Sequence, residues 1–198
     1  MELHPVIYNL MIDPLLEGVR SRVLSQLKPG LKVIDIASGT GQLAMDMAAA
    51  GVKVTGVDIE PSMIRYSIKK SNGSVPHELR FLEADAKFIH HFDHRHFDLA
   101  TMSLALHQFP SGDWEAILQE AMRISEELVI ADYFFPLPAG IKRQLVYTIE
   151  RIAGKHHFQC FREFMNAGGV IPIIQKAGYT CTHQEMSGSG IFGIYRIK

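Results

Sequence analysis

The sequence predicts an α/β fold with a doubly wound, seven-stranded sheet that is mostly parallel and ends in an antiparallel hairpin. Short apolar runs recur along the chain, and segments with helical spacing separate them. That pattern is typical of a parallel sheet covered by helices on both faces. Residues 179–185 and 191–197 both read as strands, and they are joined by residues 186–190 alone. So short a connection permits an antiparallel hairpin but no helical crossover, so one of these strands must run against the others.

The individual elements follow from local signals. The opening helix is expected over residues 6–28, because leucines and valines recur there at helical spacing and Pro29-Gly30 then ends it. Gly51 closes the next helix, and Pro61 stands where a third should begin. The remaining expected helices are 42–50, 61–70 and 114–124. The expected strands are 32–36, 52–57, 79–83, 98–103 and 128–132, followed by the two strands of the hairpin.

Length and composition indicate one domain over residues 1–198, with an N-terminal helical segment at 1–30 and a lid-like insertion at 134–178. The formal net charge of −1 gives no electrostatic reason to expect nucleic acid or an acidic membrane surface as a partner. The start of the chain lacks the features of a signal peptide, and no apolar run approaches the roughly 20 residues needed to cross a bilayer. Two widely separated cysteines are read as free thiols, so a cytoplasmic location is expected. The oligomeric state is not predicted.

The stretch DIASGTGQLA, which begins at Asp35, carries the first functional signal. Gly39 to Ala44 fits the G-x-G-x-x-G/A fingerprint of dinucleotide binding, and Asp58 lies 17 residues beyond Gly41, near the place of a ribose-binding acid. The same stretch also fits D-x-G-x-G-x-G, with Ala37 at the first glycine. Only this second interpretation uses Asp35.

The chemistry of the ligand separates the two interpretations. In both, the glycines let a ligand approach backbone N–H groups, and the next helix offers its positive end. A nicotinamide cofactor brings a pyrophosphate, beside which the Asp35 carboxylate is unhelpful. S-adenosylmethionine brings an ammonium and a sulfonium group, which a carboxylate favours. Asp35 is therefore expected to hold the N–H groups of the loop or to attract such a cation. The plainer interpretation is that it only caps a turn.

From this point the chain resembles the class I S-adenosylmethionine-dependent methyltransferases, of the small-molecule branch. VIDIASGTGQLA resembles the family's first motif, VTGVDIEPSMI the second, FLEADA the third and FDLATMSLALHQF the fourth. The resemblance implies a Rossmann-like fold and S-adenosylmethionine as cofactor, with S-adenosylhomocysteine as product. It places the following residues around the methionine part, the ribose, the adenine and the sulfonium: Asp35, Ala37, Gly39, Gly41, Asp58, Ile59, Met63, Asp85, Ala86, Ser103 and Leu104.

The sequence departs from this pattern in two places. Ala37 replaces the usual first glycine, which resembles the quinone-biosynthesis C-methyltransferases. However, Leu104-Ala105-Leu106-His107 stands where those enzymes have a Gly-Leu-Arg-Asn-like stretch. The resemblance therefore does not assign a quinone as the acceptor.

His107 is the candidate catalytic residue, because it follows the fourth strand where the acceptor should arrive. It is expected to act as a general base, to orient the acceptor or cofactor, or only to pack at the sheet edge. Tyr133 and His157 are the candidate acceptor-binding residues, and Asp132 either touches the acceptor or ties down a loop. The histidine-rich stretch 90–96 is read as a polar surface loop, and no metal site is expected.

The sequence thus predicts a cytoplasmic enzyme that transfers a methyl group from S-adenosylmethionine to a small-molecule acceptor. Two alternatives stay open at this point. One is an NAD(P)-linked oxidoreductase that uses the same glycine loop. The other is a non-catalytic protein that binds S-adenosylmethionine or its product as a regulatory ligand.

Overall fold

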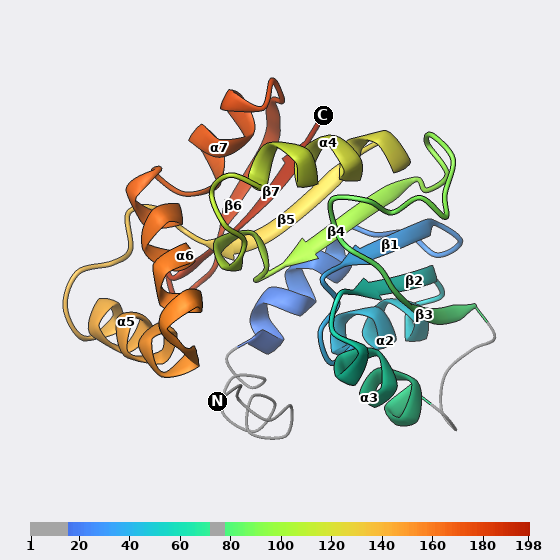
Figure 1. Ribbon diagram of the computed structural model, residues 1–198, viewed down its shortest axis with the longest axis horizontal. Coiled ribbons are helices and arrows are strands. Elements are labelled where there is room, and N and C mark those ends of the chain that lie inside the picture. The colour runs from blue at the N-terminus through green and yellow to red at the C-terminus, as the bar shows by residue number, and fades with distance from the viewer. Residues whose placement is uncertain (1–15, 72–77) are drawn as a thin grey trace.

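A computed structural model of the protein describes residues 16–71 and 78–198. Its centre is one seven-stranded sheet in the order β3-β2-β1-β4-β5-β7-β6 (Figure 1). The strands are β1 (Lys32–Ile36), β2 (Lys53–Asp58), β3 (Leu79–Glu83), β4 (Leu99–Ser103), β5 (Leu128–Tyr133), β6 (Cys181–Met186) and β7 (Phe192–Ile197).

Six strands run in one direction and β7 runs against them. β1 pairs in parallel with β2 and β4, β2 with β3, and β4 with β5. β7 lies antiparallel between β5 and β6. The predicted fold class and the hairpin inferred from loop length are therefore confirmed.

The helices lie close to where the sequence places them. Residues 16–25 are helical, whereas the rest of the predicted opening segment up to residue 15 lies outside the described residues. The other helices are α2 (Gln42–Ala49), α3 (Pro61–Ser71), α4 (Trp114–Ile124), α5 (Ile141–Ala153), α6 (Lys155–Asn166) and α7 (Val170–Lys176), with a 3₁₀ turn, η1, over Leu106–Gln108.

The core is formed by the middle of the sheet and the helices that cover it. Every residue of β5 is buried, and so are all but one residue of β1 and of β4. Successive side chains of a strand point to opposite faces, so unbroken burial means that both faces are covered. The central strands thereby form a rigid support whose ends carry the loops.

The segment 134–178 contains two structurally different parts. α7 packs against α4 and β5, as an ordinary helix of the sheet's outer layer does. α5 and α6 pack against each other, and α6 packs against η1 (Figure 1). Within this segment it is therefore α5 and α6 that stand beside the turn that follows β4.

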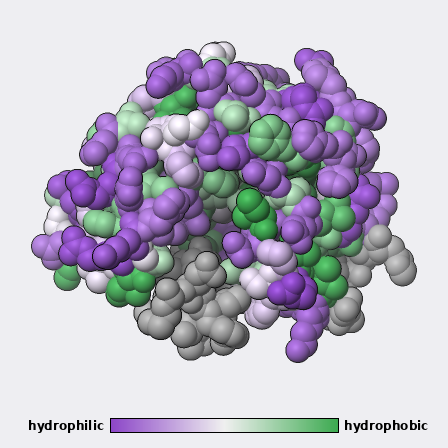
Figure 2. Space-filling model, viewed as in Figure 1, coloured by the Kyte–Doolittle hydropathy of each residue, from purple (hydrophilic) through white to green (hydrophobic). Residues whose placement is uncertain are grey.

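In the part of the chain that the structure describes, no helix is long and apolar enough to cross a bilayer. The face seen in Figure 2 is mainly hydrophilic, and its hydrophobic residues are scattered over it.

Gly56, in the middle of β2, generates a prediction about the core. A Cβ atom at this position would lie 2.6 Å from Cδ1 of Phe81 and 3.1 Å from Oγ of Ser38. Gly56→Ala should therefore lower the free energy of unfolding by roughly 1–3 kcal/mol through overpacking, measured by urea denaturation. Gly112→Ala, whose Cβ meets no atom within 4 Å, is the matched control and should be nearly neutral. The added change Phe81→Leu should recover part of the loss. Equal stability of Gly56→Ala and wild type would contradict the packing argument.

Candidate active site

The order of the strands defines where a ligand can bind. From β1 the chain fills one side of the sheet through β2 and β3, and from β4 it fills the other side. In open α/β sheets the crevice at such a switch point, outside the carboxyl ends of the strands, is the usual ligand site. The predicted cofactor residues lie at or shortly after the carboxyl ends of β1, β2, β3 and β4, so the fold gathers them at this edge.

The glycine loop after β1 is shaped by three residues with positive φ. Ala37, Gly39 and Gly41 have φ values of 56°, 54° and 72°. A Cβ at Gly41 would meet the Phe81 ring at 2.6 Å, so that glycine is required by packing. A Cβ at Gly39 would meet no atom within 4 Å, so the space above it is open. Gly39 thus leaves room for a ligand next to the N-terminus of α2, where no side chain caps the helix.

Asp58 is the residue that holds this loop in place. Its Oδ2 accepts a hydrogen bond from the N–H of Gly39 at 2.8 Å, and its Oδ1 accepts one from the N–H of Glu60 at 2.9 Å. Burial raises the pKa of the Asp58 carboxyl, although these hydrogen bonds act in the opposite direction. Each oxygen keeps a further lone pair, so a ribose can still bind to an acid that is already oriented.

Asp35 binds a hydroxyl group of β4 and not the N–H of Gly39, which was one of the roles expected of it. It is 2% exposed on β1, and its Oδ1 accepts a hydrogen bond from the Thr101 hydroxyl at 2.8 Å. The N–H of Gly39 is bound by Asp58 instead. Burial, with a smaller effect of the Asp58 charge, raises the pKa of Asp35 to about 7 against the favourable Thr101 hydrogen bond. A nearby ligand cation would favour the ionised form of a carboxyl group that is buried in this way.

The surroundings of the loop fit the ribose and adenine of S-adenosylmethionine. Ile59 follows Asp58 and is 57% exposed, so a large apolar side chain stands uncovered beside the acid. Met63 and Asp85 are half-buried, and Ala86 is buried. The hydroxyl of Ser38, inside the loop, is buried and has no hydrogen-bond partner in the described structure. An uncovered apolar side chain and an unsatisfied polar atom at one edge are what a bound nucleoside would cover and satisfy.

The ends of β4 and of the leading helix complete the cofactor side. Ser103 is half-buried, and Leu104 is buried with a positive φ of 51°, which is strained for a residue with a side chain. Arg20 of the leading helix forms an ion pair with Asp46 of α2, with 3.1 Å between Nε and Oδ2.

On the acceptor side, Asp132 fixes His107. The His107 Nδ1 atom lies 2.7 Å from Asp132 Oδ1, and the His107 backbone N–H donates to Oδ2 at 3.2 Å. The Tyr133 N–H also donates to Oδ1, at 2.7 Å. Asp132 is fully buried and His107 is 2% exposed. The carboxylate therefore joins the turn after β4 to the end of β5 and sets the orientation of the imidazole.

Glu150 of α5 links the other two predicted acceptor residues to this pair. Its Oε1 accepts a hydrogen bond from the Tyr133 hydroxyl at 2.6 Å and lies 3.7 Å from His107 Nε2. Its Oε2 lies 2.7 Å from His157 Nε2 of α6. We call His107, Asp132, Tyr133, Glu150 and His157 the buried polar cluster. The structure thus brings the three residues predicted for the acceptor side together around a glutamate.

The charges of the cluster influence one another. Burial alone would lower the pKa of His107, but the charges of Asp132 and Glu150 and the hydrogen bond to Asp132 outweigh it, so the pKa is raised. Burial alone would raise the pKa of Glu150, but His107, His157 and the Tyr133 hydroxyl outweigh it, so the pKa is lowered. Two carboxylates therefore make this cluster favourable for positive charge.

Three residues of the site were not named from the sequence. Glu150 and Val146 are the buried residues of α5, so a glutamate on the inner side of an amphipathic helix was the available signal. It was obscured by a second apolar row on the same helix, of which Ile141, Leu145 and Ile152 are exposed. Ser38 and Thr101 are small polar residues beside predicted site residues, and nothing in their spacing distinguishes them.

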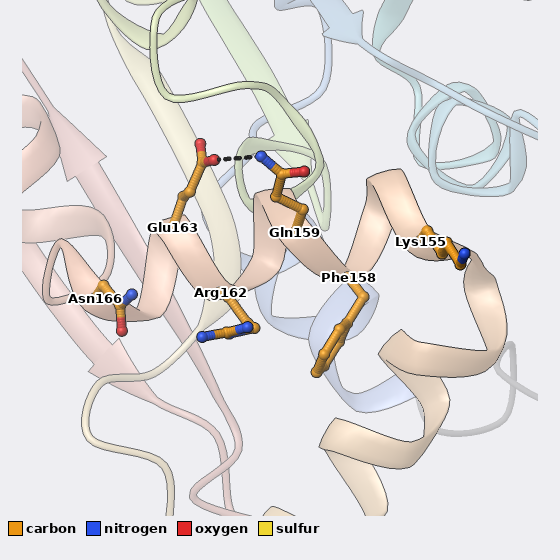
Figure 3. Close-up of a pocket in the computed structure, with 6 residues that line it drawn as sticks. All are labelled: Lys155, Phe158, Gln159, Arg162, Glu163 and Asn166. Atoms are coloured by element: carbon orange, nitrogen blue, oxygen red, sulfur yellow. Dashed lines mark hydrogen bonds between the residues drawn. The ribbon is translucent and has the colours of Figure 1, made fainter.

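Two other features lie outside the cluster. A surface hollow runs along α6 and is lined by Lys155, Phe158, Gln159, Arg162, Glu163 and Asn166 (Figure 3). In Figure 3 Gln159 and Glu163 point to one side of α6, and Phe158 and Arg162 to the other. The residues of α6 that contact the His107 ring are His157, Phe161 and Phe164, none of which lines the hollow. Within the described chain, the histidines of stretch 90–96 do not form a group of three or more potential metal ligands.

The fold and the glycine loop define the class of protein, a nucleoside-cofactor enzyme with a Rossmann-like sheet. The comparisons with known proteins specify it further. Residues 33–127 match the family model described as a methyltransferase domain. The chain is 38% identical over 165 residues to a demethylmenaquinone methyltransferase of Chlorobaculum tepidum, covering 75% of this chain and 65% of that protein. It is 30% identical over 213 residues to a demethylmenaquinone methyltransferase of Beutenbergia cavernae, covering 96% of this chain and 85% of that one.

A solved structure agrees with the fold. An S-adenosylmethionine-dependent methyltransferase from Aquifex aeolicus matches over 99% of both chains, with a TM-score of 0.70 and 19% sequence identity. The chain belongs to the class I S-adenosylmethionine-dependent methyltransferases. Membership decides against the NAD(P)-linked oxidoreductase that the glycine loop alone leaves open.

Asp35 generates a prediction about pH. The folded protein keeps the Asp35 proton up to about pH 7, whereas the unfolded chain gives it up near 3.8. Ionisation of Asp35 therefore lowers the free energy of unfolding as the pH rises through this window, and the decrease is complete above it. Asp35→Asn cannot ionise, so relative to wild type its free energy of unfolding should rise between pH 4 and 7, by roughly 2–4 kcal/mol. Urea denaturation of both proteins from about pH 4 to 8, without ligand, measures this. Asp93→Asn, in an exposed loop, is the matched control and should follow wild type. Parallel curves for Asp35→Asn and wild type would contradict the prediction.

Proposed function

We propose that this methyltransferase moves the methyl group of S-adenosylmethionine to a small-molecule acceptor that binds beneath α5 and α6, with its reacting group at His107. The observation that carries the proposal is the pairing of two sites at one sheet edge. The glycine loop with Asp58 suits the cofactor, and the buried polar cluster with His107 lies where β4 and β5 end. When bound, the cofactor supplies a methyl group activated by positively charged sulfur.

We assign the cofactor-holding roles as the family resemblance implies them. Asp58 holds the ribose, Ile59, Met63, Asp85 and Ala86 surround the adenine, and Ser103 and Leu104 lie beneath the sulfonium. Gly39 and Gly41 give the cofactor access to the loop. Asp35 favours the positive charges of the methionine part across the low-dielectric interior.

The acceptor side is formed by the ends of β4 and β5 and by the lid. α5 and α6 supply Glu150 and His157, so these helices complete the polar cluster instead of only covering it. The rings of Tyr133, Phe161 and Phe164 lie against His107 with centroids 4.9, 6.3 and 6.1 Å away. Aromatic rings therefore surround the His107 imidazole, which suits an acceptor that is a small ring or chain with a single ionisable group.

His107 is the catalytic residue in this proposal, since it meets the reacting group and promotes the departure of its proton. The acceptor is then a hydroxyl, an enol or an acidic carbon, whose proton must leave for methylation. The demethylmenaquinone methyltransferases among the relatives act on acceptors of a related kind according to their names. The protein is proposed to work in the cytoplasm as a single domain with its lid at 134–178, without nucleic acid as a partner.

The first test concerns the cofactor and uses Asp58. Asp58→Ala removes two charge-assisted hydrogen bonds to the ribose, so binding of S-adenosylmethionine should weaken by roughly 2–4 kcal/mol. Isothermal calorimetry with S-adenosylmethionine, S-adenosylhomocysteine and NADH measures this, and NADH should not bind. Asp58→Asn keeps the shape but can accept from only one of the two N–H groups, so its effect should be intermediate. An unchanged dissociation constant in folded Asp58→Ala would remove Asp58 from the cofactor site. Turnover on a panel of hydroxylated metabolites separates an enzyme from a non-catalytic binder.

The second test concerns His107. His107→Ala should lower turnover by about 10²–10⁴-fold while the affinity for S-adenosylmethionine is nearly unchanged. The change also leaves Asp132 with fewer partners, so a loss of stability on the order of 1–3 kcal/mol is expected and turnover must be normalised to folded protein. Turnover within about threefold of wild type at saturating cofactor and acceptor would exclude a catalytic role. An acceptor amine that is neutral at the working pH would give that same result.

A further inference from the structure

The ligand-type atoms of three residues in the buried polar cluster converge. One nitrogen or oxygen from each of His107, Glu150 and His157 lies within 4.8 Å of those from the other two. His107 Nε2 lies 3.7 Å from Glu150 Oε1, and His157 Nε2 lies 2.7 Å from Glu150 Oε2. Ligands of one metal ion with bonds of about 2.0–2.2 Å stand up to roughly 4.4 Å apart, so small shifts of these side chains would place all three on one ion.

An unsatisfied atom points to a missing partner in this place. Glu150 is 3% exposed, and its Oε2 has no hydrogen-bond partner in the described structure. His157 Nε2 is close to it, but the ring N–H is not aligned for a hydrogen bond, so the contact is only an approach of the two atoms. A buried carboxylate oxygen without a hydrogen bond is costly, and a cation between it and the imidazoles would remove the cost.

Each of the two best-buried ligands already has an orienting neighbour. Asp132 binds Nδ1 of His107 at 2.7 Å, and when that nitrogen carries the proton, the lone pair of Nε2 faces Glu150. The Tyr133 hydroxyl donates to Glu150 Oε1 at 2.6 Å. A carboxylate behind a histidine, which fixes its tautomer and makes it a better ligand, is the usual support of a metal-bound imidazole.

The charges also match a divalent cation. With neutral imidazoles, the cluster holds the two negative charges of Asp132 and Glu150, both buried. Lysine and arginine are absent from the contacts that the structure gives these carboxylates in its described part. Two imidazoles and one carboxylate are the ligand set of zinc and ferrous sites, and suit magnesium or calcium poorly.

We propose that His107, Glu150 and His157 bind one divalent transition-metal ion of the zinc or ferrous class. The inference deepens the proposed function, on which its catalytic meaning rests. An ion here would bind an acceptor oxygen and favour loss of its proton, so His107 would act by holding the ion. Because α5 and α6 supply Glu150 and His157, the same ion would attach the lid to the sheet.

The test is metal binding by the full chain, without cofactor or acceptor. After chelation and dialysis, the protein is incubated with Zn²⁺, desalted and analysed for metal, and Co²⁺ is titrated with visible absorption as the readout. Wild type should retain about one equivalent of Zn²⁺ and show the absorption bands of Co²⁺ bound by nitrogen and oxygen. Zn²⁺ should also raise its melting temperature.

The variants give the test its specificity. His157→Ala and Glu150→Gln should each lower the affinity at least tenfold, and Glu150→Gln keeps the shape of the side chain if His157→Ala folds poorly. His156→Ala, the exposed neighbour of His157 on α6, is the matched control and should bind like wild type. The combined change His90→Ala/His91→Ala/His94→Ala, in the histidine-rich loop, should do the same.

Two results would overturn the inference. One is wild-type protein that retains no metal, and the other is equal metal content in wild type, His157→Ala and Glu150→Gln. Calorimetry with S-adenosylmethionine on the same samples separates this outcome from failure of the proposed function. If wild type binds S-adenosylmethionine but has no specific metal site, the ion is rejected and methyl transfer stands. His107 would then accept the proton directly. Absence of cofactor binding in wild type would reject the proposed function, whatever the metal content.

Discussion

The hydrogen bonds that Asp58 accepts from Gly39 and Glu60 hold the ends of two neighbouring strands together. Gly39 lies in a loop that needs positive φ at three positions, and such a loop keeps its shape only when its N–H groups are tied. Asp58 provides this tie from the end of β2. In the proposed function the same carboxylate holds the ribose, so the group that shapes the loop would also bind the cofactor.

A second carboxylate does for the acceptor side what Asp58 does for the cofactor side. Asp132 ends β5 and binds the ring and backbone of His107, so the turn after β4 cannot move independently of the sheet. α5 and α6 bring Glu150 and His157 to this fixed pair. The rigid sheet therefore supplies the orientation of His107, and the two helices supply a second carboxylate and a second imidazole. This division suits an enzyme that must admit a small molecule and then exclude water.

The sequence predicted the strands within two residues, and the central strands most directly, because buried parallel strands are largely apolar runs between clear turn signals. The hairpin was predictable for a different reason, since the short connection before Phe192 excludes a crossover. The orientation of α5 could not be predicted from the sequence. Its two apolar rows are similar in length, and only tertiary packing decides that Val146 and Glu150 face inward while Ile141 and Leu145 face solvent. The polar cluster therefore could be named in part, but the glutamate at its centre could not.

The hydrogen-bond partners of Asp35 could not be predicted from the sequence either. Spacing predicts a carboxylate beside the glycine loop, but it does not say which of two nearby acids binds the loop N–H and which is left with a single hydroxyl partner. In the structure Asp58 accepts the hydrogen bond from the loop N–H, and Asp35 is buried with the Thr101 hydroxyl as its partner. A protein selected for stability alone would not keep an uncompensated acid there, nor place Leu104 at positive φ on the adjacent strand end. Both unfavourable features adjoin the crevice at the switch point, where a cationic ligand would offset the first. The local cost in stability and the proposed affinity for S-adenosylmethionine thus have the same physical origin.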